Sequence, residues 1–373
     1  MCKVIMIGCD LHDKTMLLKI AEGRSEPEMR SVKNTAAGRR AMIGDLKKRA
    51  AAASSARIVF AYEASGQGFG LYDDLTDAGI ECHVLAPTKI ARSQRQASQK
   101  TDEKDAQQLL ELLRAHLLAG NELPAVWIPD ATTRDDREVV RTRLDVAEKI
   151  TRVKSQIQSL LKRNHVHRDR ASGKGWTRLF RSWLKHTLCE SETGPLGLRS
   201  RATLLSLLRQ LNFLEEEVKR LDVVVHALAG EARYAAAFEE MTDLCGVGLL
   251  TAMVFLTELG DLSRFANRRQ LAAYLGLVPR SFESGNASDR KGHITHQGSS
   301  RVRKMLCQAT WSRVRWDRQE KEAYGRIVAK NPKKKKIAVV ASMRRLAVRM
   351  WHRGREFQGK PSRSMLLAAG TAA

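Results

Sequence analysis

Aromatic residues are scarce in this chain, at 5% of 373 residues, so stacking on bases is not expected to be its main mode of binding. The six cysteines are scattered and form no C-x-x-C pair, which argues against a zinc site or a disulfide framework. No apolar run approaches the roughly 18 residues that a membrane span needs, and residues 1–7 lack a signal-peptide pattern. We therefore expect a cytoplasmic protein with reduced thiols and no membrane partner.

Positive charge is in excess, and most of it lies in the last third of the chain. The whole chain carries 65 Lys and Arg against 41 Asp and Glu, a formal net charge of +24. Residues 261–373 alone carry 26 against 7, which leaves +19 there. Cationic side chains that neutralise phosphates release condensed counterions, whereas charge added for solubility alone is more often acidic. A nucleic-acid partner therefore explains the asymmetry better than a solubilising surface does.

Strand and helix patterns alternate over residues 1–125. Apolar runs typical of buried strands occur at Lys3–Cys9, Thr15–Ile20, Arg57–Tyr62 and Glu81–Ala86. Apolar residues at helical spacing mark Ala36–Ala53, Phe69–Ala78 and Thr101–Leu118. These patterns predict an α/β domain that ends just before a proline-flanked linker.

Residues 126–237 are predicted to form a helical linker and a coiled coil. Val139–Leu161 and Arg201–Leu228 read as long helices, and the second carries an apolar a/d-like seam over about three heptads. Such a seam serves self-association or spacing, or it packs on a neighbouring domain. The basic segment Lys162–Arg199 between the two helices matches no pattern.

Residues 238–373 are predicted to form a basic, mainly helical domain. Gly246 and Gly248 precede an apolar helix, as in a helix-hairpin-helix turn, where amides at the helix N-terminus either hold a phosphate or only cap the helix. Arg280–Ser299 is expected to be a polar loop of about 20 residues, a length that is often functional. Further helices are expected at Arg268–Leu277, Ser300–Arg315 and Ile337–Trp351.

Four acidic residues are placed so that they could bind metal ions together. Asp10 and Glu63 each follow a predicted buried strand, and Asp102 and Asp105 lie three residues apart on one face of a helix. Carboxylate oxygens are the ligands that Mg²⁺ prefers, and two bridged cations assist phosphoryl transfer. Taken singly, each acid also fits a helix-capping, turn or loop role. In this order on these elements they predict a two-metal site for Mg²⁺ or Mn²⁺.

Several motifs go beyond composition. The N-terminal ones are Gly8-Cys9-Asp10-Leu11-His12, Tyr62-Glu63-Ala64-Ser65-Gly66 and Lys100-Thr101-Asp102-Glu103-Lys104-Asp105-Ala106. The C-terminal ones are Gly246-Val247-Gly248, Thr257-Glu258-Leu259-Gly260-Asp261, Gln270 to Pro279, Ser284-Gly285, Gly292-His293-Ile294, Gly298 and Arg301. With these motifs the chain resembles the Piv-like DEDD transposases and DNA invertases of insertion sequences, which are bridge-RNA-guided recombinases. The resemblance covers about two-thirds of the chain.

The resemblance implies a RuvC-like RNase H fold over residues 1–125, a coiled-coil middle over 126–237 and a transposase domain over 238–373. It implies that the four acids bind the metal and that Ser284, in the segment after Leu-Val-Pro, attacks DNA. Many relatives have Ser-Ser-Gly where this chain has Glu283-Ser284-Gly285, so a neighbouring serine is the alternative nucleophile. It also implies donor and target DNA and a guide RNA. The acids and Ser284 lie far apart in sequence, so folding or a second subunit must bring them together; we predict a dimer or tetramer, associated with the nucleoid.

Three functions compete at this stage. The first is a recombinase that cuts and rejoins DNA through the acids and Ser284, with no need for ATP because bond energy is kept. The second is a junction-resolving, RuvC-like two-metal nuclease that uses water. The third is a nucleic-acid scaffold whose acids are structural. In each case phosphate contacts are predicted at Arg280, Lys291, Arg301, Arg303 and Lys304.

Overall fold

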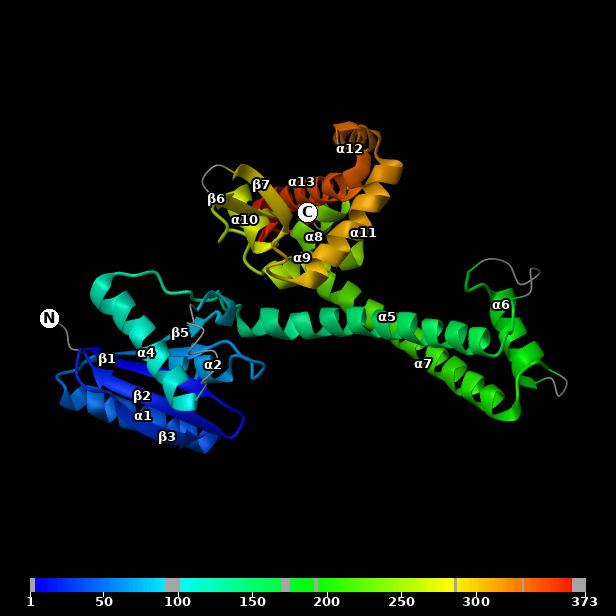
Figure 1. The fold of residues 1–373 in the computed structure, drawn as a ribbon. Coiled ribbons are helices and arrows are strands. Elements are labelled where there is room, and N and C mark those ends of the chain that lie inside the picture. Colours follow the sequence, from blue (N-terminus) through cyan, green and yellow to red (C-terminus); the bar gives the residue numbers. More distant parts are fainter. Residues whose placement is uncertain are drawn as a thin grey trace, which may run out of the picture. The chain divides into compact units, whose positions relative to one another are not determined.

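The computed structural model describes residues 4–90, 101–168, 175–190, 194–284, 287–330 and 332–363, without the side chains of 281–284 and 287–291. The chain divides into two compact units, residues 1–128 and 129–373, each with its own core (Figure 1). No helix among the described residues combines the length and apolar character that a membrane span needs.

The first unit is built on a five-stranded mixed sheet in the order β3-β2-β1-β4-β5. Its strands are β1 (Val4–Leu11), β2 (Thr15–Glu22), β3 (Glu28–Lys33), β4 (Arg57–Glu63) and β5 (Glu81–Leu85). β1 pairs antiparallel with β2 and parallel with β4. This mixed sheet agrees with the expected RNase H-like fold, and the predicted strands are confirmed apart from β3, which the polar sequence EMRSVK did not indicate.

Helices cover both faces of this sheet. The helices are α1 (Ala36–Ala52), α2 (Gly70–Asp77) and α4 (Asp102–Ala119), with a short 3₁₀ turn at Pro87–Lys89. Residues of β1 alternate between two clusters: Ile5 and Ile7 pack with α1 and α2, whereas Met6 packs with α4. Successive side chains of a strand point to opposite faces, so Gly8 and Asp10 share the α4 face with Met6.

The second unit is centred on α9 (Leu249–Leu259), whose residues Thr251–Leu259 are all buried. A helix that is apolar on every side belongs in the middle of a core. The helices α8 (Ala235–Thr242), α10 (Arg268–Tyr274), α11 (Ser300–Trp316), α12 (Arg318–Lys330) and α13 (Lys335–Phe357) complete this domain, with a 3₁₀ turn at Pro332–Lys334. The sequence patterns did not indicate α12.

Two long helices, α5 (Ala131–Arg163) and α7 (Leu198–Ala229), pack against each other beside this core (Figure 1). Arg143 on α5 holds Asp222 on α7 through two hydrogen bonds of 2.7 and 3.0 Å. At the other end lies a tip made by α6 (Arg178–Ser182) and a π-helical segment, Trp183–Glu190. The two long helices are therefore confirmed, and the coiled coil stays a prediction.

The polar segment after α10 is not the loop that we expected. It forms an antiparallel hairpin of β6 (Pro279–Ser284) and β7 (Ala287–Ile294), in which Ser284 pairs with Ala287. The Gly285-Asn286 dipeptide is a sequence signal for a two-residue hairpin connection, but the polar composition of both flanks concealed the strand pattern. Only residues 295–299 separate the hairpin from α11.

Candidate active site

The four predicted acids lie on two strands and one helix of the first unit. Asp10 and Glu63 occupy the carboxyl ends of β1 and β4, which are parallel neighbours with Cys9 opposite Tyr62. Val59 and Ala61 pack in the cluster of α4, so Glu63, two residues further on, shares that face of the sheet. Asp10 and Glu63 therefore lie on the same face and at the same end of the sheet, on strands about 4.8 Å apart.

The start of α4 brings Asp102 and Asp105 to this end of the sheet. Thr101 caps the helix by accepting a hydrogen bond of 3.3 Å from the Lys104 amide. Lys19, a buried residue of β2, donates a hydrogen bond of 2.6 Å to Glu103 and ties the first turn to the sheet. Asp105 is itself buried. The two acids therefore lie on a fixed first turn.

Gly8 explains how close α4 comes to β1. A Cβ atom at Gly8 would lie 2.3 Å from the carbonyl oxygen of Ala106 and 2.4 Å from the amide nitrogen of Leu110. No other residue fits beneath the helix backbone at this distance. This contact sets the height of the first turn of α4 above Asp10.

His12 lies between two of the carboxylates, a role that the sequence analysis missed. Its Nε2 atom is 3.0 Å from Oδ2 of Asp10 and 3.3 Å from Oδ1 of Asp102. Ligand atoms of Asp10, His12 and Asp102 all lie within 4.8 Å of one another, a spacing that a metal ion can bridge. The signal available in the sequence was the Asp-x-His spacing at the end of a buried strand.

Neighbouring charges and burial both shift the pKa of the Asp10 carboxyl. Burial raises the pKa of this carboxyl above its ordinary value, the neighbouring His12 lowers it, and the negative charges of Asp102 and Asp105 raise it again. A divalent cation would relieve both the desolvation and the repulsion, because it stabilises the ionised form of every acid around it. The donor set of carboxylate oxygens and one imidazole thus fits a divalent metal.

Ser284 lies in the other unit, at the end of β6. Its backbone position is described, but its side chain and Gly285 lie outside the described residues, as does the side chain of Lys291. The two glycines of the predicted phosphate-binding turn precede α9: Gly246 has a φ of 82° and packs against the carbonyl of Ala309, and Gly248 is the N-cap. The close approach to α11 is sufficient reason for Gly246.

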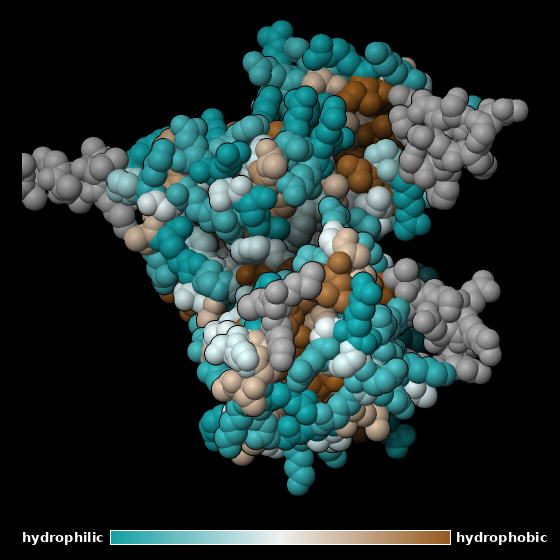
Figure 2. Space-filling view, turned by 90° about the vertical axis from the view of Figure 1, so that its left-hand side faces the viewer, coloured by the Kyte–Doolittle hydropathy of each residue, from teal (hydrophilic) through white to brown (hydrophobic). Residues whose placement is uncertain are grey.

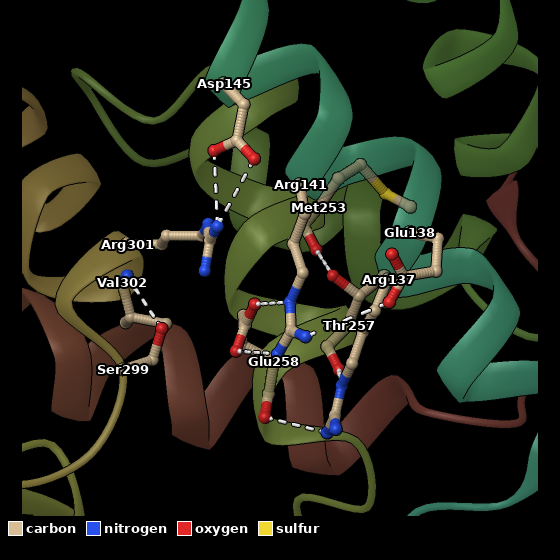
Figure 3. A network of polar contacts seen from close by, with 10 residues as sticks. All are labelled: Arg137, Glu138, Arg141, Asp145, Met253, Thr257, Glu258, Ser299, Arg301 and Val302. Carbon is tan, nitrogen blue, oxygen red and sulfur yellow. Dashed lines mark hydrogen bonds and ion pairs between the residues drawn. The ribbon is translucent and has the colours of Figure 1, made fainter. Parts of the chain in front are cut away.

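Three of the predicted phosphate ligands have partners within the protein. Arg301 pairs with Asp145 on α5 at 3.2 Å (Figure 3). Lys304 pairs with Glu148 on the same helix at 2.7 Å. Arg303 donates to the carbonyls of Leu275, Gln297 and Gly298, and burial lowers its pKa. Arg280 is exposed on β6. Phosphate binding by these residues stays a prediction, and for Arg303 a structural role is already visible.

Sequence comparisons place the chain among transposases. The profile described as Transposase IS116/IS110/IS902 family matches residues 239–325, and a DEDD-type profile of IS110 transposases matches residues 7–166. A putative transposase, y4qE, of Sinorhizobium fredii is 29% identical over 94% of this chain and 88% of its own length. The transposase for insertion sequence element IS1533 of Leptospira borgpetersenii is 24% identical over 83% and 86%, and that for IS1111A of Coxiella burnetii 26% over 65% and 62%.

Proposed function

Because the chain belongs to the IS116/IS110/IS902 family of transposases, we propose that it cuts and rejoins DNA with a metal-bound carboxylate site and the hydroxyl of Ser284. The observation that carries this proposal is the grouping of Asp10, Glu63, Asp102 and Asp105, which we call the acidic site, on one face and at one end of the sheet. A scaffold protein has no need to collect these charges around a buried Asp10.

The acidic site is proposed to hold Mg²⁺ or Mn²⁺. Ligand atoms of Asp10, Asp102 and His12 lie close together, and the charge of Asp105 acts on Asp10. Glu63 lies at the same end of the sheet, on the neighbouring strand. When bound, divalent cations at such a site polarise a phosphate and stabilise the oxygen that leaves. The carboxylates favour Mg²⁺, whereas the imidazole nitrogen favours Mn²⁺.

Ser284 is proposed as the nucleophile. Its oxygen forms a bond to phosphorus while the bond from phosphorus to a DNA oxygen breaks. The hydroxyl proton passes to a base, and the departing DNA oxygen takes up a proton. One phosphodiester replaces another, so the reverse step rejoins a strand without ATP. The position of Ser284 suits this role, since it is the last residue of β6 and pairs with Ala287 of β7.

The acids and the serine belong to different units of the chain. We propose that they meet in a homodimer or tetramer on donor and target DNA, with a guide RNA that selects the site. Support comes from the family resemblance and from the +19 charge of residues 261–373. A site shared between subunits would keep an isolated subunit inactive.

Cleavage by point variants tests the chemistry. Ser284→Ala should abolish cleavage and the protein–DNA adduct seen in denaturing gels, whereas Ser281→Ala, a serine on the same strand, should retain both. Asp102→Asn should also abolish cleavage, with Asp77→Asn on α2 as the control. If Ser284→Ala still cuts and forms no adduct, the enzyme uses water and the nuclease alternative holds. If it cuts and still forms an adduct, a neighbouring serine is the nucleophile. If Asp102→Asn leaves transposition unchanged, the acids are structural.

Mixing the two inactive variants tests the shared site. Oligomers that combine Asp102→Asn with Ser284→Ala contain some sites with both groups intact, so strand cleavage should reappear. Labelled mixed oligomers that stay wholly inactive would show that each chain builds its own site.

A further inference from the structure

A large groove opens in the second unit beside the β6–β7 hairpin. Its volume is about 1300 Å³, above the usual range for a small-molecule pocket. The walls come from both hairpin strands, from α10 and α11, and from α13. All twenty residues that line it lie within the described parts of this unit, so it does not depend on how the two units are arranged.

The floor of the groove is apolar and includes an accessible aromatic ring. Leu277, Ile294, Val339, Val340 and Val348 contribute aliphatic surface. Trp311 on α11 is 49% exposed and makes an edge-on contact with Tyr324, at 5.8 Å between ring centroids. Apolar areas are bordered by hydrophilic residues on the face drawn in Figure 2. An apolar floor of this size favours a ligand with flat, weakly polar faces.

The rim of the groove carries positive charge only. Its lining includes six cations and no Asp or Glu; the cations are Arg268, Arg269, Lys336, Arg344, Arg345 and Arg349. Arg345 is held by Glu320. Among the described residues no ion pair occupies the other five. Basic groups around an exposed aromatic ring are the combination that binds phosphates and bases of an unpaired strand.

We infer that this groove binds unpaired nucleotides, with a base on Trp311 and the backbone phosphates along Arg268, Arg344 and Arg349. A duplex presents phosphates but keeps its base faces stacked, so it would leave the apolar floor uncovered. An acidic peptide would satisfy the rim but has no flat face for Trp311. The groove contains Pro279, the first residue of β6, and Ser284 follows five residues later, about 17 Å along the strand. A nucleic-acid strand that reaches Ser284 therefore passes close to the groove.

Binding to short oligonucleotides tests the inference. Fluorescence anisotropy would be measured with labelled dT12, labelled U12 and a 20-base-pair duplex, in EDTA so that no cleavage interferes. Trp311→Ala should weaken binding of a single strand by about 5- to 150-fold, the range for one stacked base, and leave duplex binding within about twofold. Trp311→Phe should restore most of the affinity. The comparison of dT12 with U12 shows whether the unpaired strand is DNA or RNA.

Trp316→Ala is the matched control, because Trp316 is a more exposed tryptophan on the same helix and does not line the groove. The double variant Arg344→Gln with Arg349→Gln should flatten the salt dependence of dT12 binding by about 1.4 units in the log–log slope. Equal losses for single strand and duplex, an equal effect of Trp316→Ala, or competition by polyglutamate as strong as by dT12 would overturn the inference. The inference rests on the proposed function only for its link to Ser284, and binding without metal is measured independently of cleavage.

Discussion

A buried ion pair joins α5 to the central helix of the second unit, and its removal should destabilise that unit strongly. Arg141 on α5 donates two hydrogen bonds, of 2.7 and 3.1 Å, to the carboxylate of Glu258 on α9 (Figure 3). The side chain of Glu258 is only 8% exposed. Arg137 donates to the carbonyls of Thr257 and Glu258 at 2.6 and 3.0 Å. Arg141→Met would leave a buried carboxylate without its bidentate partner.

The size of the loss follows from the chemistry of Glu258. Removing one partner of a buried pair costs about 3–5 kcal/mol. The unpaired carboxylate can become neutral by binding a proton. For an ordinary glutamate with a pKa of 4.5, protonation at pH 7 costs about 3.4 kcal/mol. Protonation limits the loss, so we expect Arg141→Met to lower the free energy of unfolding by about 3 kcal/mol at pH 7.

The pH dependence of the stability loss distinguishes the loss of the ion pair from a loss of packing. Burial alone would raise the pKa of Glu258, but the hydrogen bonds and charge of Arg141 and the charge of Arg137 hold it below its ordinary value. In the native protein this pair therefore stabilises the fold above pH 4.5, and that stability is lost as the pH falls through the lowered pKa. In Arg141→Met burial dominates and the pKa rises, so the difference between the two proteins should shrink from pH 7 to pH 5.

Hydrogen exchange of the α9 amides, followed by mass spectrometry, measures the loss of stability at this helix. Arg143→Met is the control: the same substitution two residues away breaks a similar bidentate pair, but its acid, Asp222, is 38% exposed. We expect that control to cost under about 1 kcal/mol. A second variant, Arg141→Met with Glu258→Met, should regain most of the stability. If Arg141→Met costs no more than Arg143→Met, or if the loss is the same at pH 5, the reasoning is wrong.

Three further predictions concern the acidic site. Gly8→Ala should lower the stability of the first unit by about 1–3 kcal/mol in urea unfolding and weaken Mn²⁺ binding, because α4 must move away from β1. Gly44→Ala should do neither, because a Cβ atom at Gly44 would meet open space. His12→Gln should weaken Mn²⁺ binding by about tenfold or more in calorimetry while Mg²⁺ binding changes less, and equal losses would exclude a nitrogen ligand. Asp105→Asn should weaken both metals while far-UV circular dichroism is unchanged, and unaltered affinities would place Asp105 outside the metal site.

The sequence predicted the first unit well because its central strands, β1 and β4, are buried on both faces. Apolar runs such as Arg57–Tyr62 leave few other structures open, and the acids that follow them fall at one end of a sheet as soon as the strands are parallel. The edge strand β3 was missed because an exposed edge tolerates polar residues at every position. His12 was missed because only the arrival of Asp102, 90 residues later, makes it part of a site.

Prediction was weaker in the second unit, where the elements depend on contacts that are distant in sequence. The hairpin β6–β7 is polar on both strands, so its alternation carries little signal, and α12 is a short helix of largely exposed residues whose Glu320 is buried against Arg345. Arg345 comes 25 residues after its partner. No local pattern distinguishes a basic residue that lines a groove from one on open surface, so the groove at Trp311 was not foreseen.

The pairs between α5 and α11 bear on how residues 261–373 bind nucleic acid. Arg301 and Lys304 were predicted as phosphate ligands, and both face acids, Asp145 and Glu148, whose side chains are 49% and 58% exposed. Such exposed pairs are worth at most about 1 kcal/mol, so a phosphate that releases counterions can replace either acid at little cost. Arg303 differs, since it holds three carbonyls that a phosphate would leave without a donor. Of these neighbouring cations, the two that pair with exposed acids are therefore the ones free to exchange onto DNA, and the third keeps the turn before α11 in place while they do.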